Sequence, residues 1–197
     1  RDRGLSASGW GALPPPAGRG GPAGGAESRR KHSACNADEG DPGSIKDRSL
    51  LETNPHAVIE GMVVAGYAIG ASEGIIYASI RNRLALERVQ IAVDQAVEKG
   101  FLDNDIPGAD FHFSIKVRTV PEAFIGGEET AALAAFACGR PIPKVRPPYQ
   151  SEKRLHGNPH VIENVETLAA VSCIIANGAD ECDALGTSPL LAPLRHH

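Results

Sequence analysis

The sequence predicts an α/β fold built on a mainly parallel β-sheet flanked by helices. The first observation is that the spacing of apolar residues switches repeatedly between the period of a strand and the period of a helix. The second is that the expected strands and helices alternate, which favours parallel strands joined by right-handed helical crossovers. The third is the composition, 42% hydrophobic and 22% charged, which is typical of a globular domain.

The elements expected in the first half of the chain begin with a helix over residues 55–70. Asn54 followed by Pro55 is typical of a helix start, because asparagine caps the first N–H groups and proline fits the first turn. A β-prone run predicts a buried strand at 74–80, and apolar residues at helical spacing predict a second helix at 84–97.

In the second half of the chain, alternating apolar and polar residues predict a strand over 111–118 with one exposed face. A helix is expected at 128–136, and residues 140–160, rich in proline and basic side chains, are expected to form a long loop. The last expected helix covers 164–177.

Composition divides the chain into three parts. Residues 1–30 contain 8 of the 22 glycines and no Ile, Val or Phe, so we expect a flexible Gly/Pro-rich segment. Residues 31–185 carry the periodic pattern and are expected to form the folded domain, and 186–197 form a tail without pattern.

Charge and hydropathy exclude several classes of partner. With 20 basic and 24 acidic residues, the chain offers no footprint for nucleic acid. No apolar run reaches the roughly 20 residues of a membrane-spanning helix, so no direct membrane insertion is expected. The cysteines match no zinc or iron–sulfur spacing, and dispersed cysteines are typical of buried thiols in a reducing, cytoplasmic compartment. They are Cys35, Cys138, Cys173 and Cys182.

Residues 35–43 combine short polar side chains with turn-forming residues. Asp38, Glu39 and Asp41 place three carboxylates within four residues. One interpretation is a solvated acidic turn held by local hydrogen bonds. The other is a ligand site, in which Asn36 would both donate and accept, whereas ionised carboxylates would only accept.

Two expected helix starts are candidate anion sites. Paired glycines precede Glu128 at one of them, and Asn164 precedes Glu166 at the other. Exposed N–H groups and the helix dipole favour an anion there, yet an asparagine cap and a first-turn glutamate also stabilise a helix without any ligand. The basic segment around Arg146 could meet a pyrophosphate or remain a solvated loop.

Six short motifs follow one another within residues 33–182. They are Cys-Asn-Ala-Asp-Glu-Gly-Asp-Pro-Gly at 35–43, Lys46-Asp47-Arg48, Asn54-Pro55-His56, Gly-Glu-Glu-Thr-Ala at 127–131, Arg146-Pro147-Pro148 and Asn-Val-Glu-Thr-Leu at 164–168. In this order they resemble the flavin-bearing, NADH-binding subunit of respiratory complex I and its relatives in soluble NAD-linked hydrogenases and formate dehydrogenases.

The resemblance implies a Rossmann-like domain that holds FMN without a covalent bond and stacks NADH on the flavin. By position, the residues implied around FMN are Asn36, Asp38, Gly127, Glu128, Asn164 and Thr167. Those implied for NADH are Asp41, where the family usually has Glu, Glu129, and Arg146, where it usually has Lys. Glu163 stands where a second Asn is expected, and a carboxylate beside the flavin or its phosphate would repel it.

The function implied is that of an NADH dehydrogenase flavoprotein module with a quinone-type acceptor. Hydride would pass from NADH to FMN, and electrons would pass to an iron–sulfur cluster on a region or partner subunit outside this chain. Partner subunits would hold the module at the inner face of a membrane, and no side chain would act as acid, base or nucleophile.

The glycine-rich stretch at 18–25 lacks the aromatic residues and lysine of the family's loop. The alternative is therefore an impaired fragment or scaffold remnant without tight FMN binding.

Overall fold

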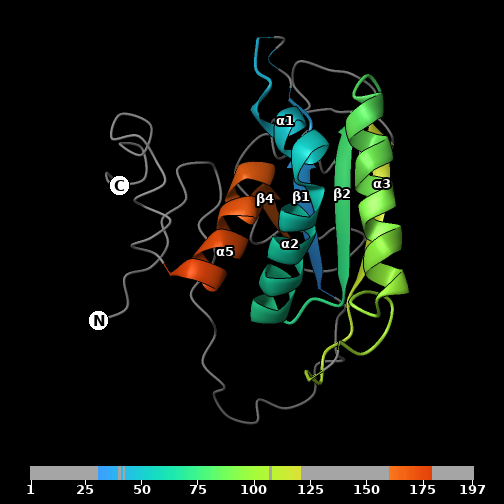
Figure 1. Cartoon of the computed structure of the whole chain (residues 1–197), viewed down its shortest axis with the longest axis vertical. Coiled ribbons are helices and arrows are strands. Elements are labelled where there is room, and N and C mark those ends of the chain that lie inside the picture. The colour runs from blue at the N-terminus through green and yellow to red at the C-terminus, as the bar shows by residue number, and fades with distance from the viewer. Residues whose placement is uncertain (1–30, 40, 42, 107, 121–159, 179–197) are drawn as a thin grey trace, which may run out of the picture.

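The computed structural model describes residues 31–39, 41, 43–106, 108–120 and 160–178. The elements follow one another in an alternating order (Figure 1). They are β1 (His32–Ala37), α1 (Lys46–Thr53), α2 (Pro55–Ile69), β2 (Glu73–Ser79), α3 (Arg83–Glu98), β3 (Ser114–Val120), β4 (His160–Asn164) and α5 (Val165–Asn177).

The four strands form one sheet in the order β3-β2-β1-β4, and every described pair of neighbours is parallel. The chain moves outward from β1 through β2 to β3 and then returns to the other side of β1 for β4. The direction of strand succession therefore reverses between β1 and β4. This reversal creates the topological switch point at which open α/β sheets bind ligands.

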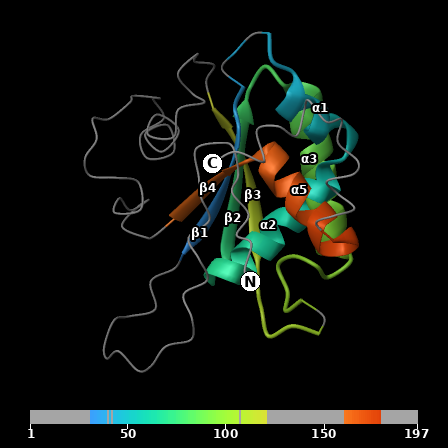
Figure 2. The ribbon, with the colours of Figure 1, turned by 90° about the vertical axis from the view of Figure 1, so that its left-hand side faces the viewer.

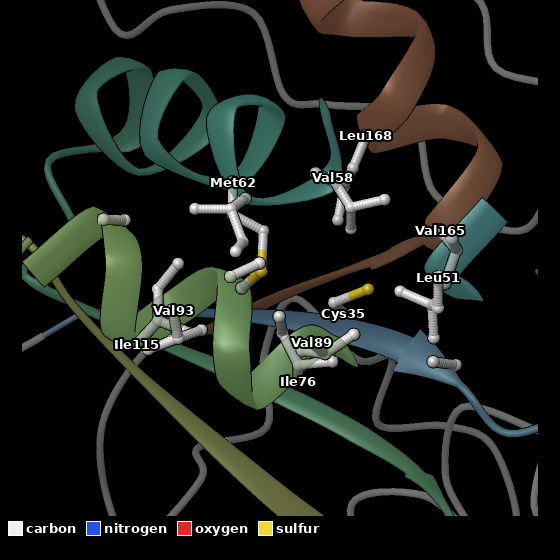
Figure 3. Close-up of a cluster of buried hydrophobic side chains, with 14 of the residues drawn as sticks. Cys35, Leu51, Val58, Met62, Ile76, Val89, Val93, Ile115, Val165 and Leu168 are labelled. Atoms are coloured by element: carbon white, nitrogen blue, oxygen red, sulfur yellow. The ribbon is translucent and has the colours of Figure 1, made fainter. Parts of the chain in front are cut away.

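The described helices all lie against one face of the sheet, as the edge-on view shows (Figure 2). Alternate residues of the strands supply this face, and they build the main core with the helices. Cys35 of β1 lies in this core beside Leu51 of α1 and Val165 and Leu168 of α5 (Figure 3). The residues between them in the strands form a smaller apolar cluster on the opposite face, which contains Ala34, Ile162 and the partly buried Ile75.

The helices α2 and α5 pack with almost no space between their backbones. A Cβ atom at Gly61 of α2 would clash with the backbone carbonyl of Leu168 in α5. Across the same interface, Ser172 Oγ donates to the carbonyl oxygen of Ala57 at 2.6 Å. Because a backbone carbonyl cannot move as a side chain does, this glycine fixes how closely α5 approaches α2.

The fold class predicted from sequence is confirmed, and so are the helices expected at 55–70, 84–97 and 164–177 and the strand expected at 74–80, each within about a residue. The strand expected at 111–118 is shifted. It joins the sheet only at Ser114, because the backbone carbonyl oxygens of Phe111 and Phe113 instead accept hydrogen bonds at 2.9 Å from the N–H groups of Ile106 and Asp103 in the preceding loop.

Three elements were not predicted, namely β1, α1 and β4. The helix expected at 128–136 lies outside the described residues.

Cys35 is a buried free cysteine, as expected. Cys173 is disulfide-bonded, so the expectation of free thiols is wrong for this half-buried residue, whose partner is outside the described residues.

Candidate functional site

Two helices begin at the carboxyl ends of β1 and β4, where the strand order reverses (Figure 1). Helix α1 follows the loop after β1, and α5 follows β4 directly. Both helix starts therefore present N–H groups and the positive end of a helix dipole to the same end of the sheet.

The sheet register brings together two of the residues implied around FMN. Asn36 of β1 pairs with Asn164 of β4, so these asparagines lie side by side although they are far apart in the sequence. Asn36 Oδ1 accepts a hydrogen bond from the backbone N–H of Asp38 at 3.1 Å, which holds the turn after β1. The Asp38 side chain is buried at this turn, with 4% of the residue's surface exposed.

Glu39 closes the start of α1. Its carboxylate accepts hydrogen bonds from the backbone N–H groups of Asp47 at 2.9 Å and Arg48 at 3.1 Å, and from the hydroxyl of Ser44 at 2.7 Å. Burial acts to raise the pKa of Glu39, but these hydrogen bonds outweigh it and hold the pKa below its ordinary value. Ile45, the residue before α1, provides no side-chain cap, so Glu39 is the cap of this helix.

Asp47 connects the starts of α1 and α5. Its Oδ1 accepts from Lys46 Nζ at 2.7 Å, and its Oδ2 accepts from Asn164 Nδ2 at 2.8 Å. Lys46 Nζ also donates to Asn164 Oδ1 at 2.9 Å, which completes a triangle of three side chains. Burial raises the pKa of Asp47, and the hydrogen bonds from Lys46 and Asn164 offset part of that effect.

The start of α5 is capped by a neutral side chain. Asn164 Oδ1 accepts from the backbone N–H of Glu166 at 3.0 Å. The carboxylate of Glu166 is exposed and lies 3.5 Å from Lys46 Nζ. Thr167 stands in the same first turn, and within the described part of the chain its hydroxyl has no hydrogen-bond partner. This helix start therefore keeps a donor that none of the described residues uses.

Glu163 lies on the helix-covered face of the sheet. It pairs in register with Cys35, so both side chains point to the same face, opposite to that of Asn36. Only 3% of Glu163 is exposed. Burial raises the pKa of the Cys35 thiol, and the charges of Asp47 and Glu163 raise it further. A cluster of acidic groups therefore lies beneath the site.

Asp41 lies in the exposed turn before α1. Its side chain is exposed, and its Oδ1 accepts from the backbone N–H of Gly43 at 2.9 Å within the turn that leads to α1. The remaining residues implied by the resemblance lie outside the described residues, so the structure does not place them. They are Gly127, Glu128, Glu129 and Arg146.

Sequence reasoning assigned no role to Glu39, Lys46 or Asp47, which hold this site together. The signal for Lys46 and Asp47 was their place in a family motif, and the signal for Glu39 was the cluster of carboxylates after Asn36. Among the described residues, no group of three or more His, Cys, Asp or Glu residues could hold a metal ion. None of the described helices is long and apolar enough to cross a membrane.

Comparison with known proteins gives consistent results. A family model described as the Nuo51 FMN-binding domain matches residues 22–173. The NADP-reducing hydrogenase subunit HndC of Solidesulfovibrio fructosivorans is 40% identical over 164 residues, which are 83% of this chain and 33% of the relative. A subunit of the NADH-quinone oxidoreductase of Aquifex aeolicus is 40% identical over 163 residues, which are 83% of this chain and 38% of the relative.

Solved structures match as well. An NAD+-reducing NiFe-hydrogenase in the H2-reduced state has a TM-score of 0.70 and 36% sequence identity, over 81% of this chain and 27% of that chain. The chain thus spans about a third of the length of the curated relatives just described.

Proposed function

The chain belongs to the family of Nuo51 FMN-binding domains, and from this membership we propose that it is the FMN- and NADH-binding module of an NADH-oxidising electron-transfer complex. The observation that carries the proposal is the pairing of Asn36 with Asn164 beside the start of α5. Nucleotides bind open α/β sheets at such a switch point. We assign Asn36, Asp38, Asn164 and Thr167 to FMN.

The donors at the start of α5 fit the phosphate of FMN. The Thr167 hydroxyl has no partner within the described residues, and it lies in the first turn of the helix, where the dipole favours an anion. Lys46, which is half exposed, adds a positive charge beside the same turn. A hydroxyl, a helix start and an ammonium group form a donor set that suits a phosphate monoester.

The residues after β1 suit the rest of the cofactor. Asn36 can donate and accept, and an ionised Asp38 accepts from ribityl hydroxyls or ring N–H groups. When bound, FMN supplies hydride acceptance from NADH and the release of single electrons. The task of the side chains is to hold the two ring systems in a productive orientation, so we expect no acid, base or nucleophile among them.

For NADH we propose Asp41, whose exposed carboxylate lies in the turn before α1, together with Glu129 and Arg146. Gly127 and Glu128 are proposed to complete the FMN site. Electrons would leave for an iron–sulfur cluster on another region or on a partner subunit, in a complex related to NADH-quinone oxidoreductase or to an NAD-linked hydrogenase. In a complex of the first kind, partner subunits would hold the module at the inner face of a membrane.

One observation favours a second candidate function, a scaffold remnant that does not retain FMN. Glu163 stands where the family has asparagine, and it adds a buried carboxylate to the side of the site that already holds Asp47. Negative charge at this place weakens the attraction of the helix start for a phosphate.

A titration of the purified chain with FMN, followed by the quenching of flavin fluorescence, separates the two candidates. We expect saturable binding of one FMN per chain, followed by steady reduction of ferricyanide by NADH. A protein that takes up no FMN would contradict the proposed function and favour the scaffold remnant, and one that binds FMN without reducing ferricyanide would contradict the proposed NADH site.

The variant Thr167→Val tests the phosphate assignment, because it removes a hydroxyl and keeps the shape of the side chain. We expect FMN affinity to fall about tenfold, the effect of one lost hydrogen bond to a charged group, with an unchanged melting temperature. Thr53→Val at the far end of α1 is the matched control. An affinity within twofold of the unmodified chain would show that the phosphate lies elsewhere.

A further inference from the structure

The junction between the starts of α1 and α5 depends on one buried carboxylate. Asp47 has 4% of its surface exposed, and its two oxygens contact different partners, Lys46 Nζ at 2.7 Å and Asn164 Nδ2 at 2.8 Å. Asn164 lies 117 positions further along the chain, so this contact joins the two halves of the site.

These contacts select one orientation of the Asn164 amide. The amide oxygen accepts from Lys46 Nζ at 2.9 Å and from the backbone N–H of Glu166 at 3.0 Å, and the amide nitrogen donates to Asp47. A flipped amide would point its oxygen at the Asp47 carboxylate and its N–H groups at the Lys46 ammonium group. All of these contacts would then become repulsive, because a carboxylate only accepts and an ammonium group only donates.

The amide nitrogen of Asn164 carries two N–H groups, and one of them is used by Asp47. Within the described residues the second N–H has no hydrogen-bond partner. We propose that Asp47 is a positioning residue for FMN, which holds the Asn164 amide so that this second N–H is presented to an acceptor atom of the cofactor. The inference rests on the proposed function, because it requires FMN to lie against Asn164.

Asp47 therefore acts on FMN only through Asn164. Without the carboxylate, Lys46 and the N–H of Glu166 still hold the amide oxygen, but the nitrogen loses the acceptor that opposes rotation. We expect the fold to survive this loss, while the cofactor meets an amide in more than one orientation.

The test is an FMN titration of the full chain, with melting temperatures measured in parallel. Asp47→Asn removes the charge and keeps the shape, and we expect FMN affinity to fall about tenfold. Glu52→Gln is the matched control, because it removes a carboxylate from the other end of the same helix, where Glu52 pairs with Arg48. This control is expected to bind FMN as the unmodified chain does.

A double variant separates positioning from simple stabilisation. Asp47→Asn combined with Asn164→Asp exchanges the two groups, so that the amide stands at position 47 and the carboxylate at position 164. One negative charge stays beside Lys46, and aspartate becomes the cap of α5. We expect the exchange to restore the melting temperature but not FMN affinity, because position 164 then has no N–H to present. The single variant Asn164→Asp is the reference, because it removes the same N–H from position 164. If Asp47 acts on FMN only through Asn164, the double variant binds FMN as Asn164→Asp does, whereas weaker binding by the double variant would show an effect of Asp47 that does not pass through Asn164.

Each outcome decides the inference. FMN affinity within twofold of the unmodified chain for Asp47→Asn would overturn it, and so would full recovery of affinity in the double variant. If Asp47→Asn does not fold, the double variant decides alone, and its own failure to fold contradicts the inference because the reversed pair keeps the contacts invoked. If the unmodified chain binds no FMN, the proposed function fails first and the inference fails with it.

Discussion

The starts of α1 and α5 lie at the same end of the sheet but are capped by different kinds of side chain, a carboxylate at α1 and a neutral amide at α5. At α1 the chain supplies its own anion, since the Glu39 carboxylate accepts from two backbone N–H groups. At α5 the cap is the neutral Asn164, and the hydroxyl of Thr167 has no partner within the described residues. A helix start that already holds a carboxylate is structural, whereas one with a neutral cap can accept an anion from a ligand.

The difference between the two helix starts depends on how α5 packs against α2. The largest effect on stability is therefore expected from Gly61→Ala, at the contact between these helices. The added Cβ would clash with the backbone carbonyl of Leu168 and push α5 away from α2. We expect the free energy of unfolding to fall by about 3 kcal/mol, the upper range for overpacking a core, in urea titrations. Glu60→Ala, on the exposed side of α2, should cost less than about 0.5 kcal/mol. A loss below about 1 kcal/mol for Gly61→Ala would show that α5 is not fixed by this contact.

The next effect concerns α1 and follows from the substitution Glu39→Ala. The variant leaves the backbone N–H groups of Asp47 and Arg48 without their acceptor, and we expect it to cost about 2 kcal/mol in free energy of unfolding. Glu52→Gln on the same helix should change the free energy of unfolding by less than about 0.5 kcal/mol. If the two variants are equally stable, Glu39 is not the cap of α1.

The same contact makes stability depend on pH with a defined sign. The pKa of Glu39 is lower in the folded chain than in the unfolded chain, so the stabilisation is complete at neutral pH. It is lost as the pH falls below the ordinary value of 4.5 and through the lowered value of the folded state. The difference in unfolding free energy between the unmodified chain and Glu39→Gln should therefore shrink over this range. A difference that does not change with pH would contradict the hydrogen bonds described.

Part of the fold could be predicted from sequence because its signals are local. Helix α2 begins with an asparagine cap and a proline, and its apolar residues recur at helical spacing. Strand β1 gave no such signal. A central strand that is buried on both faces shows no alternation of apolar and polar residues, and the small residues of β1 are not β-branched. Helix α1 was missed because its cap, Glu39, lies in the loop before it and not at the adjacent Ile45.

The site could be predicted only in part for a related reason. Asn36, Asp38, Asn164 and Thr167 were named through the resemblance, but the pairing of Asn36 with Asn164 results from strand order, which no local pattern carries. The triangle of Lys46, Asp47 and Asn164 likewise joins segments that meet only when β4 returns beside β1.

The smallest expected effect comes from a substitution at the start of α5 itself. Here the chain places an exposed carboxylate, that of Glu166, which a ligand could displace. Glu166 lies 3.5 Å from Lys46 Nζ, in the first turn where a phosphate would bind. Glu166→Gln should cost about 0.5 kcal/mol in free energy of unfolding, since one favourable charge near the helix dipole is lost. It should nevertheless raise FMN affinity about twofold to threefold in the fluorescence titration, because a competing anion is removed. A lower affinity would mean that Glu166 contacts the cofactor, and that α5, like α1, is closed by an anion of its own.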